Sequence, residues 1–218
     1  LYLPALPEMT KFFAVPEIVM NTTLILFFVF YSIATLFWGP LSDRYGRRPI
    51  LLIGLTLYMV ASILCGIATN AYEIIIFRVL QAIGGGVATT IATAVIKDVF
   101  VGRKQETTLA IVQSMVVISP AIAPVIGSLL LTFISWRGIF FAQALLGASV
   151  IYGALIFKET HQANHETTSV LRSFGRLGVL LLNPGFTALL FSFSLMSIVS
   201  LSYISSSSYI FQDTFHLS

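Results

Sequence analysis

Long apolar segments alternate with short polar connections along the chain. A helix needs about 20 mostly apolar residues to cross the hydrocarbon core of a bilayer. The sequence therefore predicts six membrane-spanning helices, over residues 17–39, 50–68, 72–96, 107–133, 138–157 and 184–206. We expect residues 1–7 to be the end of a further span, truncated at its start.

Cap residues support two of these boundaries. Asn70 with Glu73 three residues later is a pattern typical of a helix N-terminus. Asn183 followed by Pro184 places a cap residue before a proline at the first helical position, where the missing N–H has no intrahelical partner to lose. Both patterns predict helices that begin close to the start of an apolar segment.

One connection, residues 158–183, is much longer than the others and begins with a polar stretch. It divides the sequence into an N-terminal helical half over 1–157, a linker over 158–183 and the first helix of a second half over 184–218. We therefore predict an all-α membrane protein with the layout of a two-halved transporter, in which six helices precede the linker.

Composition agrees with a lipid-facing chain. Only 10% of the 218 residues are charged, and the mean hydropathy is +0.93. Soluble domains carry about 25% charge, so most of this chain has to face lipid. The formal net charge of +3 is too small and too dispersed to predict nucleic-acid binding. The spans contain no cluster of His, Asp or Cys, so we expect neither an enzyme nor a metal site nor a cofactor.

Lysine and arginine positions predict the orientation, since basic residues concentrate in cytoplasmic connections. With the 40–49 connection cytoplasmic, that side holds nine basic residues: Arg44, Arg47, Arg48, Lys97, Arg103, Lys104, Lys158, Arg172 and Arg176. The other side holds two, Lys11 and Arg137, and Arg78 lies within a span. We expect a multi-pass protein of the bacterial inner membrane, monomeric in the bilayer.

The connection between the first two full spans carries the most specific pattern in the sequence, formed by Gly39, Asp43, Arg44, Gly46, Arg47 and Arg48. A basic connection alone would need neither the acidic residue nor the two glycines. The pattern resembles the G-x-x-x-D-R-x-G-R-R loop of the major facilitator superfamily at every defining position. We expect Arg47 to pair with Asp98 at the cytoplasmic end of the 72–96 span, and Asp43 to face a helix N-terminus of the other half. The resemblance implies that such a charge relay acts as a conformational switch. We also expect Gly39 to permit close helix approach and Gly46 a tight turn.

Arg78 lies about two turns inside a predicted span, where a charge costs several kcal/mol unless it faces a cavity or a partner. Gln81 is three residues later, on the same helix face. The stretch resembles the family's R-x-x-Q-G motif, with Ala82 in place of glycine. We predict a coupling role for both side chains, against the alternative that Arg78 snorkels to the outer surface. Small residues recur every four positions nearby and predict helix packing, at Ala82, Gly86, Thr90 and Ala94.

Two prolines, Pro120 and Pro124, lie in the fourth full span, followed by Gly127. Each removes a backbone donor, so the sequence predicts a kink. The stretch resembles the antiporter motif of the family, G-P-x-x-G-G, with Ala123 and Ser128 replacing two glycines. The resemblance implies export rather than uptake, whereas an ordinary kinked helix is the alternative.

The opening Tyr2–Pro7 segment, together with Trp136-Arg137 and Glu159-Thr160, resembles the bicyclomycin and chloramphenicol resistance exporters within that family. This resemblance implies proton-driven efflux of small drug-like molecules, with an acidic residue just before Leu1. A porter for a metabolite or nutrient is the alternative function. We expect the cavity to be lined by polar or adaptable groups within the spans, at Tyr31, Arg78, Gln81, Gln113, Met115 and Tyr203.

Overall fold

The structure is a computed structural model that describes residues 2–160 and 178–209, with side chains described up to residue 199. The chain forms two compact units, Leu1–Glu166 and Thr167–Ser218. The expected linker lies largely outside the described residues, and so does the side chain of Tyr203.

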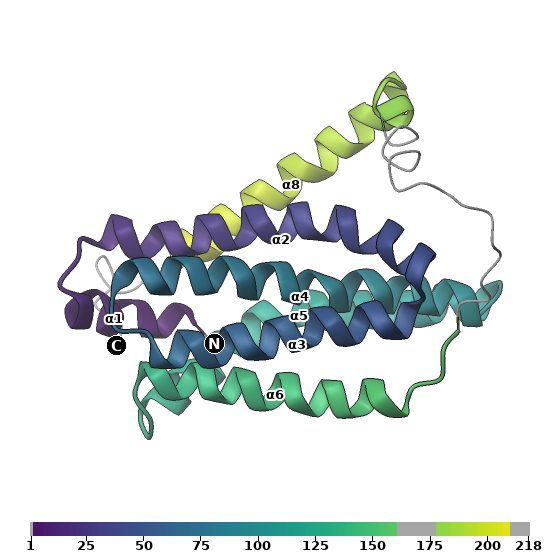
Figure 1. Cartoon of the computed structure of the whole chain (residues 1–218). Helices are drawn as coiled ribbons and strands as arrows, with labels where there is room; N and C mark the ends of the chain where they lie inside the picture. The colour runs from purple at the N-terminus through teal and green to yellow at the C-terminus, as the bar shows by residue number, and fades with distance from the viewer. Residues whose placement is uncertain (1, 161–177, 210–218) are drawn as a thin grey trace. The chain divides into compact units, whose positions relative to one another are not determined.

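The first unit is a bundle of helices (Figure 1). Its elements are η1 (Leu3–Ala5), α1 (Leu6–Phe13), α2 (Glu17–Tyr45), α3 (Arg47–Ile67), α4 (Ala71–Val99), α5 (Arg103–Leu131) and α6 (Trp136–Ile156). Five of them, α2 to α6, are long and apolar enough to cross a membrane. The N-cap predicted at Asn70 is confirmed, because its Oδ1 accepts a hydrogen bond from the Glu73 N–H at 2.9 Å.

The second unit contains α8 (Pro184–Tyr209), which coincides with the sixth predicted span. Its described apolar stretch, Pro184–Val199, is shorter than the five candidate spans of the first unit. The predicted cap is present here too, since Asn183 Oδ1 accepts hydrogen bonds from the N–H groups of Gly185 and Phe186.

The predicted extent of the connection at 40–49 is wrong. Helix α2 continues through Pro40 to Tyr45, and α3 begins at Arg47, so Gly46 alone separates the two helices. Gly46 has φ 96° and ψ 152°, a conformation open almost only to glycine. Proline removes only one backbone donor, and α2 continues past it. The polar motif therefore lies on helix ends that extend beyond the apolar segment.

Glycines set how closely α4 packs against its neighbours. A Cβ atom on Gly84 would lie 2.5 Å from the backbone N of Tyr58 in α3, whereas one on Gly86 would lie 3.3 Å from the carbonyl oxygen of Tyr31 in α2. The predicted small-residue stripe therefore does pack against a helix at Gly86, but the closest contact is at Gly84, on another face. Gly39 does not require the close approach expected for it, because a Cβ there would make an ordinary 3.8 Å contact with Thr90.

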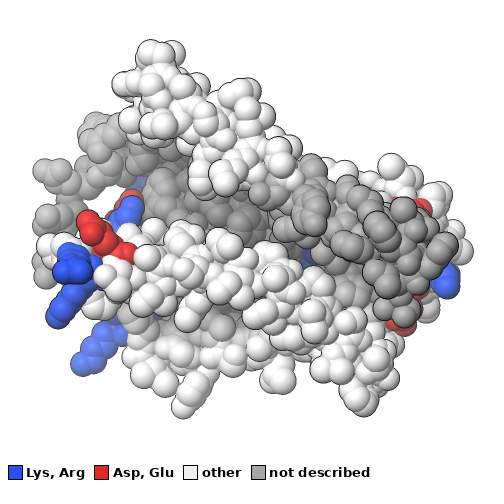
Figure 2. Space-filling model, turned by 180° about the vertical axis from the view of Figure 1, so that it is seen from behind, with Lys and Arg blue, Asp and Glu red and all other residues white. Residues whose placement is uncertain are grey.

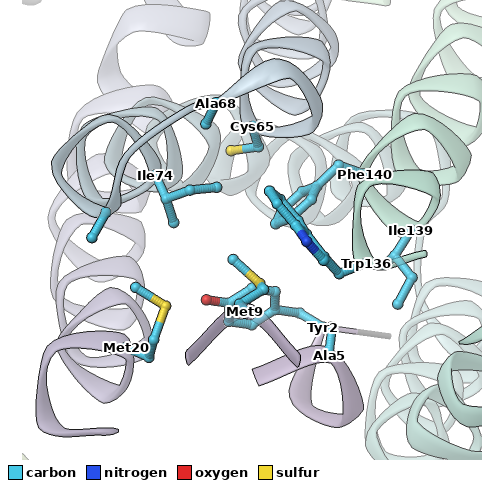
Figure 3. Close-up of a cluster of buried hydrophobic side chains, with 11 residues drawn as sticks. Tyr2, Ala5, Met9, Met20, Cys65, Ala68, Ile74, Trp136, Ile139 and Phe140 are labelled. Carbon is cyan, nitrogen blue, oxygen red and sulfur yellow. The ribbon is translucent and has the colours of Figure 1, made fainter. Parts of the chain in front are cut away.

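Buried apolar side chains form two clusters in the first unit. One joins the start of the chain to the beginnings of α4 and α6, and Figure 3 shows Tyr2 and Met9 below Trp136, with Met20 on the side of Ile74. The other joins the later turns of α2 and α4 to the start of α3, around Trp38 and Val87. Helix α5 takes little part, since Gly127 is its one buried residue. It is helical throughout despite Pro120 and Pro124, and the kink predicted there remains a prediction.

Candidate functional site

Arg78 is buried inside the helix bundle, with 5% of its surface exposed. Its guanidinium carbon lies 4.1 Å from the ring centroid of Tyr2 and 4.2 Å from that of Phe27. Both rings are within the range of a cation–π interaction. The snorkelling alternative is therefore wrong, because the positive charge is enclosed by aromatic rings rather than extended to the surface.

A chain of hydrogen bonds joins Arg78, in α4, to two other helices. Its Nη1 donates to Gln81 Oε1 at 2.7 Å within α4. The Gln81 Nε2 group donates to Ser62 Oγ in α3 at 2.6 Å and to Gln143 Oε1 in α6 at 2.8 Å. All four side chains are buried. A connected and buried polar network of this kind fixes the relative positions of the helices that contribute to it.

No salt bridge joins Arg78 to an aspartate or glutamate in the described part of the chain. Its Nε is buried and has no hydrogen-bond partner there. A buried guanidinium with an unused donor is costly, and buried polar groups of this kind usually have a partner. The site therefore offers a positive charge and a free donor to an acceptor group.

The structure brings together some of the predicted cavity residues. Tyr31 stacks on Phe27 with 6.2 Å between ring centroids, and its hydroxyl is 2.8 Å from Thr89 Oγ1. It therefore adjoins the Arg78 site through Phe27. Gln113 and Met115 lie exposed on α5 and make no described contact with this site.

Four members of the site were absent from the sequence-based prediction: Tyr2, Phe27, Ser62 and Gln143. Gln143 carried a signal, since it is a glutamine in the middle of an apolar span, as Gln113 is. The other three are residue types common in membrane helices, and only packing shows their role.

A second polar cluster lies at the ends of α2, α4 and α6 and at the start of α3. Arg47 donates from Nε to Asp98 Oδ2 at 2.9 Å, and from Nη1 to Asp43 Oδ1 at 2.5 Å and to Ser42 Oγ at 2.7 Å. The expected pairing of Arg47 with Asp98 is thus present. Asp43 binds Arg47 in the same bundle, and Arg44 lies over the ring of Tyr45.

Glu159, just after α6, completes this cluster. Its two carboxylate oxygens each accept a backbone N–H at 3.0 Å, one from Arg47 and one from Arg48. These N–H groups are at the start of α3, where the helix dipole favours a negative charge. Arg48 Nη2 in turn donates to the carbonyl oxygen of Leu155 in α6 at 2.6 Å. The sequence did not predict this role for Glu159, and the expectation that Asp43 faces a helix N-terminus of the other half stays a prediction.

Charge is distributed accordingly over the molecule. On the face shown in Figure 2, Lys, Arg, Asp and Glu lie mainly toward the two ends of the helices, and the described surface between them is almost uncharged. No group of three or more His, Cys, Asp or Glu side chains that could hold a metal ion is found among the described residues.

Five helices long and apolar enough to cross a membrane, three of them joined by a buried polar network, are typical of a multi-pass membrane protein. The model of the Major Facilitator Superfamily matches residues 1–218, and the chain therefore belongs to that family. Its members are transporters rather than enzymes.

Similar proteins agree with this assignment. The chain is 30% identical over 165 residues to the multidrug resistance protein MdtL of Escherichia coli O9:H4 (strain HS) and equally to that of Shigella flexneri. Each match covers 75% of this chain and 42% of the relative, so the matched region is less than half of the relative's length. This chain is also similar to the crystal structure of the human organic anion transporter MFSD10 (TETRAN), with a TM-score of 0.67. The match covers 100% of this chain and 57% of the MFSD10 chain. At 17% identity, that likeness shows the fold alone.

Proposed function

We propose that this chain serves in a proton-coupled exporter of small drug-like molecules that works by alternating access. The observation that carries the proposal is Arg78, a buried cation with an unused donor inside an apolar bundle. Intramembrane charges of this kind mark substrate or proton pathways. The similarity to relatives named as multidrug resistance proteins supports drugs as the substrate class.

The direction of transport is export in this proposal. The relatives' name supports it, and so does the resemblance of Pro120, Pro124 and Gly127 to the antiporter motif. The energy source is the proton gradient. The proton-carrying group remains unassigned, because no Asp or Glu lies in the middle of a full span.

The cluster around Arg47 has the role of a conformational switch in this proposal. It ties four helices together through charged contacts at helix ends, and such contacts can break and reform when two halves rock against each other. The excess of basic residues supports a position of this cluster on the cytoplasmic side of a bacterial inner membrane. The protein functions as a monomer surrounded by lipid.

Uptake by inside-out membrane vesicles tests the proposal. Vesicles containing the full-length protein are given an acidic interior, and the accumulation of radiolabelled chloramphenicol is followed with and without an uncoupler. We expect accumulation that the uncoupler abolishes. Accumulation no greater than in vesicles lacking the protein would contradict chloramphenicol export and favour a metabolite or nutrient porter.

A further inference from the structure

The buried network around Arg78 has one possible direction of hydrogen bonding. A guanidinium only donates, so Gln81 must present its oxygen to Arg78 and its NH₂ group to the opposite side. There the NH₂ group needs acceptors. Ser62 Oγ is one, because the Ser62 hydroxyl hydrogen is used on the carbonyl oxygen of Tyr58 at 2.7 Å. Gln143 Oε1 is the other, at 2.8 Å.

The aromatic rings leave Arg78 few other contacts. Tyr2 and Phe27 cover its guanidinium at 4.1 and 4.2 Å, so hydrogen bonding is left to its edges. The Tyr2 ring is itself held in place, since its hydroxyl is 2.7 Å from Thr23 Oγ1 in α2. The rotation of the guanidinium between the rings is therefore fixed by its bond to Gln81. That bond decides which edge of Arg78 remains available to an acceptor.

We propose that Gln143 is a positioning residue for Arg78, which acts through the amide of Gln81. This inference rests on the proposed transport function, in which Arg78 serves coupling. Of the two acceptors for the Gln81 NH₂ group, Gln143 is the one on α6, whereas Ser62 is on α3. A loss of the Gln143 oxygen leaves one N–H of Gln81 buried without a partner. The amide is then held on that side by Ser62 alone, so its oxygen is less firmly fixed at the edge of Arg78.

Two substitutions separate positioning from packing. Gln143→Leu keeps a similar volume and removes the acceptor, whereas Gln143→Glu keeps an acceptor oxygen at the same reach in either protonation state. Ser149→Ala is the matched control, because Ser149 is exposed on the same helix and its hydroxyl donates to the Leu146 carbonyl oxygen in its own helix. In the vesicle assay we expect Gln143→Leu to lower the maximal rate of chloramphenicol uptake about tenfold and to change its pH profile. The tenfold decrease corresponds to weakening the hydrogen bond between Gln81 and the charged Arg78.

The expected KM of Gln143→Leu stays within about twofold, and Gln143→Glu restores at least half of the maximal rate. Ser149→Ala behaves as the unsubstituted protein. A wild-type rate and pH profile in Gln143→Leu would overturn the positioning role. Failure of Gln143→Glu to restore transport would also overturn it, because a retained acceptor would then not be what matters.

A double-mutant cycle tests the inference without transport. Thermal unfolding of the purified protein in detergent is compared for Gln143→Leu, Arg78→Lys and the double variant. Gln143 has no hydrogen bond to Arg78 in the described structure, so shifts in Tm that are not additive would show coupling through Gln81. Additive shifts would overturn the inference. Absence of uptake by the unsubstituted protein would contradict the proposed function alone, and the cycle would then decide the role of Gln143.

Discussion

Two arginines of the helix bundle are almost equally buried but are stabilised in different ways. Arg47, at the start of α3, binds the carboxylates of Asp43 and Asp98. Arg78, inside α4, binds the amide of Gln81 and lies between two aromatic rings. Asp43 and Asp98 keep 57% and 27% of their side-chain surface exposed, so water still solvates these carboxylates.

The difference follows from where each arginine lies along its helix. At the helix end, the carboxylates keep part of their hydration and pair with the buried guanidinium, so the charge of Arg47 is compensated by opposite charges. Inside the span, a charge costs about 3 kcal/mol or more. One hydrogen bond to a charged group contributes about 1.5–3 kcal/mol, and a desolvated cation–π contact contributes up to about 2 kcal/mol. These contacts can hold Arg78 in the interior while its charge remains unpaired, whereas Arg47 is already paired. We therefore expect changes near Arg78 to have larger effects.

The largest effect is expected from Arg78→Lys. Lysine keeps the charge, but an ammonium group lacks the planar surface that fits between Tyr2 and Phe27. Loss of the stacking and of the fixed bond to Gln81 removes roughly 3 kcal/mol, and we expect the rate of chloramphenicol uptake in vesicles to fall about 100-fold. Arg103→Lys, an exposed change at the start of α5, is the control. A rate within a factor of two of the unsubstituted protein would place Arg78 in the same class as the surface arginines.

The next effect concerns the packing that encloses the interior network. In Gly84→Ala the new methyl group would lie 2.5 Å from the backbone N of Tyr58, so α3 and α4 must separate. We expect a loss of about 2 kcal/mol in stability and a Tm lower by about 4–8 °C in detergent. Gly85→Ala is the matched control, because its methyl group would meet the Tyr58 ring at an ordinary 3.4 Å. Equal Tm values for the two variants would show that α3 and α4 can separate without cost.

The same contrast explains what could be predicted from the sequence. The Arg78–Gln81 bond and the Asn70 cap each join residues three apart on one helix, so helix geometry predicts both. The pairing of Arg47 with Asp98, across 51 residues, was predicted because both residues lie at the cytoplasmic ends of predicted spans. Local periodicity and a specific motif thus predicted the helices and part of each site.

The remaining contacts depend on how the helices pack. Gln143 meets Gln81 across 62 residues, and Glu159 meets the start of α3 across 112 residues from Arg47. The rotation of α4 decides that Gly84, rather than its neighbour Gly85, meets a backbone. Periodicity shows that α4 has a small-residue face, but it does not say which helix lies against that face.

A smaller effect is expected at the end cluster from Asp43→Asn. Arg47 keeps Asp98 and Ser42 as partners, and the lost charge is more than half exposed, so stability changes by less than about 1 kcal/mol. The contact is proposed to break and reform during transport, and we expect uptake to fall about three- to tenfold with an unchanged amount of protein in the membrane. Glu106→Gln, at an exposed carboxylate on α5, is the control. Unchanged uptake would remove Asp43 from the switch.

The smallest effect is expected from Glu159→Gln. The amide oxygen can still accept one of the two N–H bonds from the start of α3, but the negative charge at the helix N-terminus is lost. We expect a loss of about 0.5–1 kcal/mol, measured as a Tm lower by about 1–4 °C. Because this charge lies near water, the difference in Tm should shrink as ionic strength rises from roughly 0.01 to 1 M, where the screening length falls from about 30 to 3 Å. Arg78 is enclosed by protein, so the loss of Tm in Arg78→Lys should not change over the same range of ionic strength. If the two losses of Tm responded alike to salt, burial would not be what separates the interior site from the cluster at the helix ends.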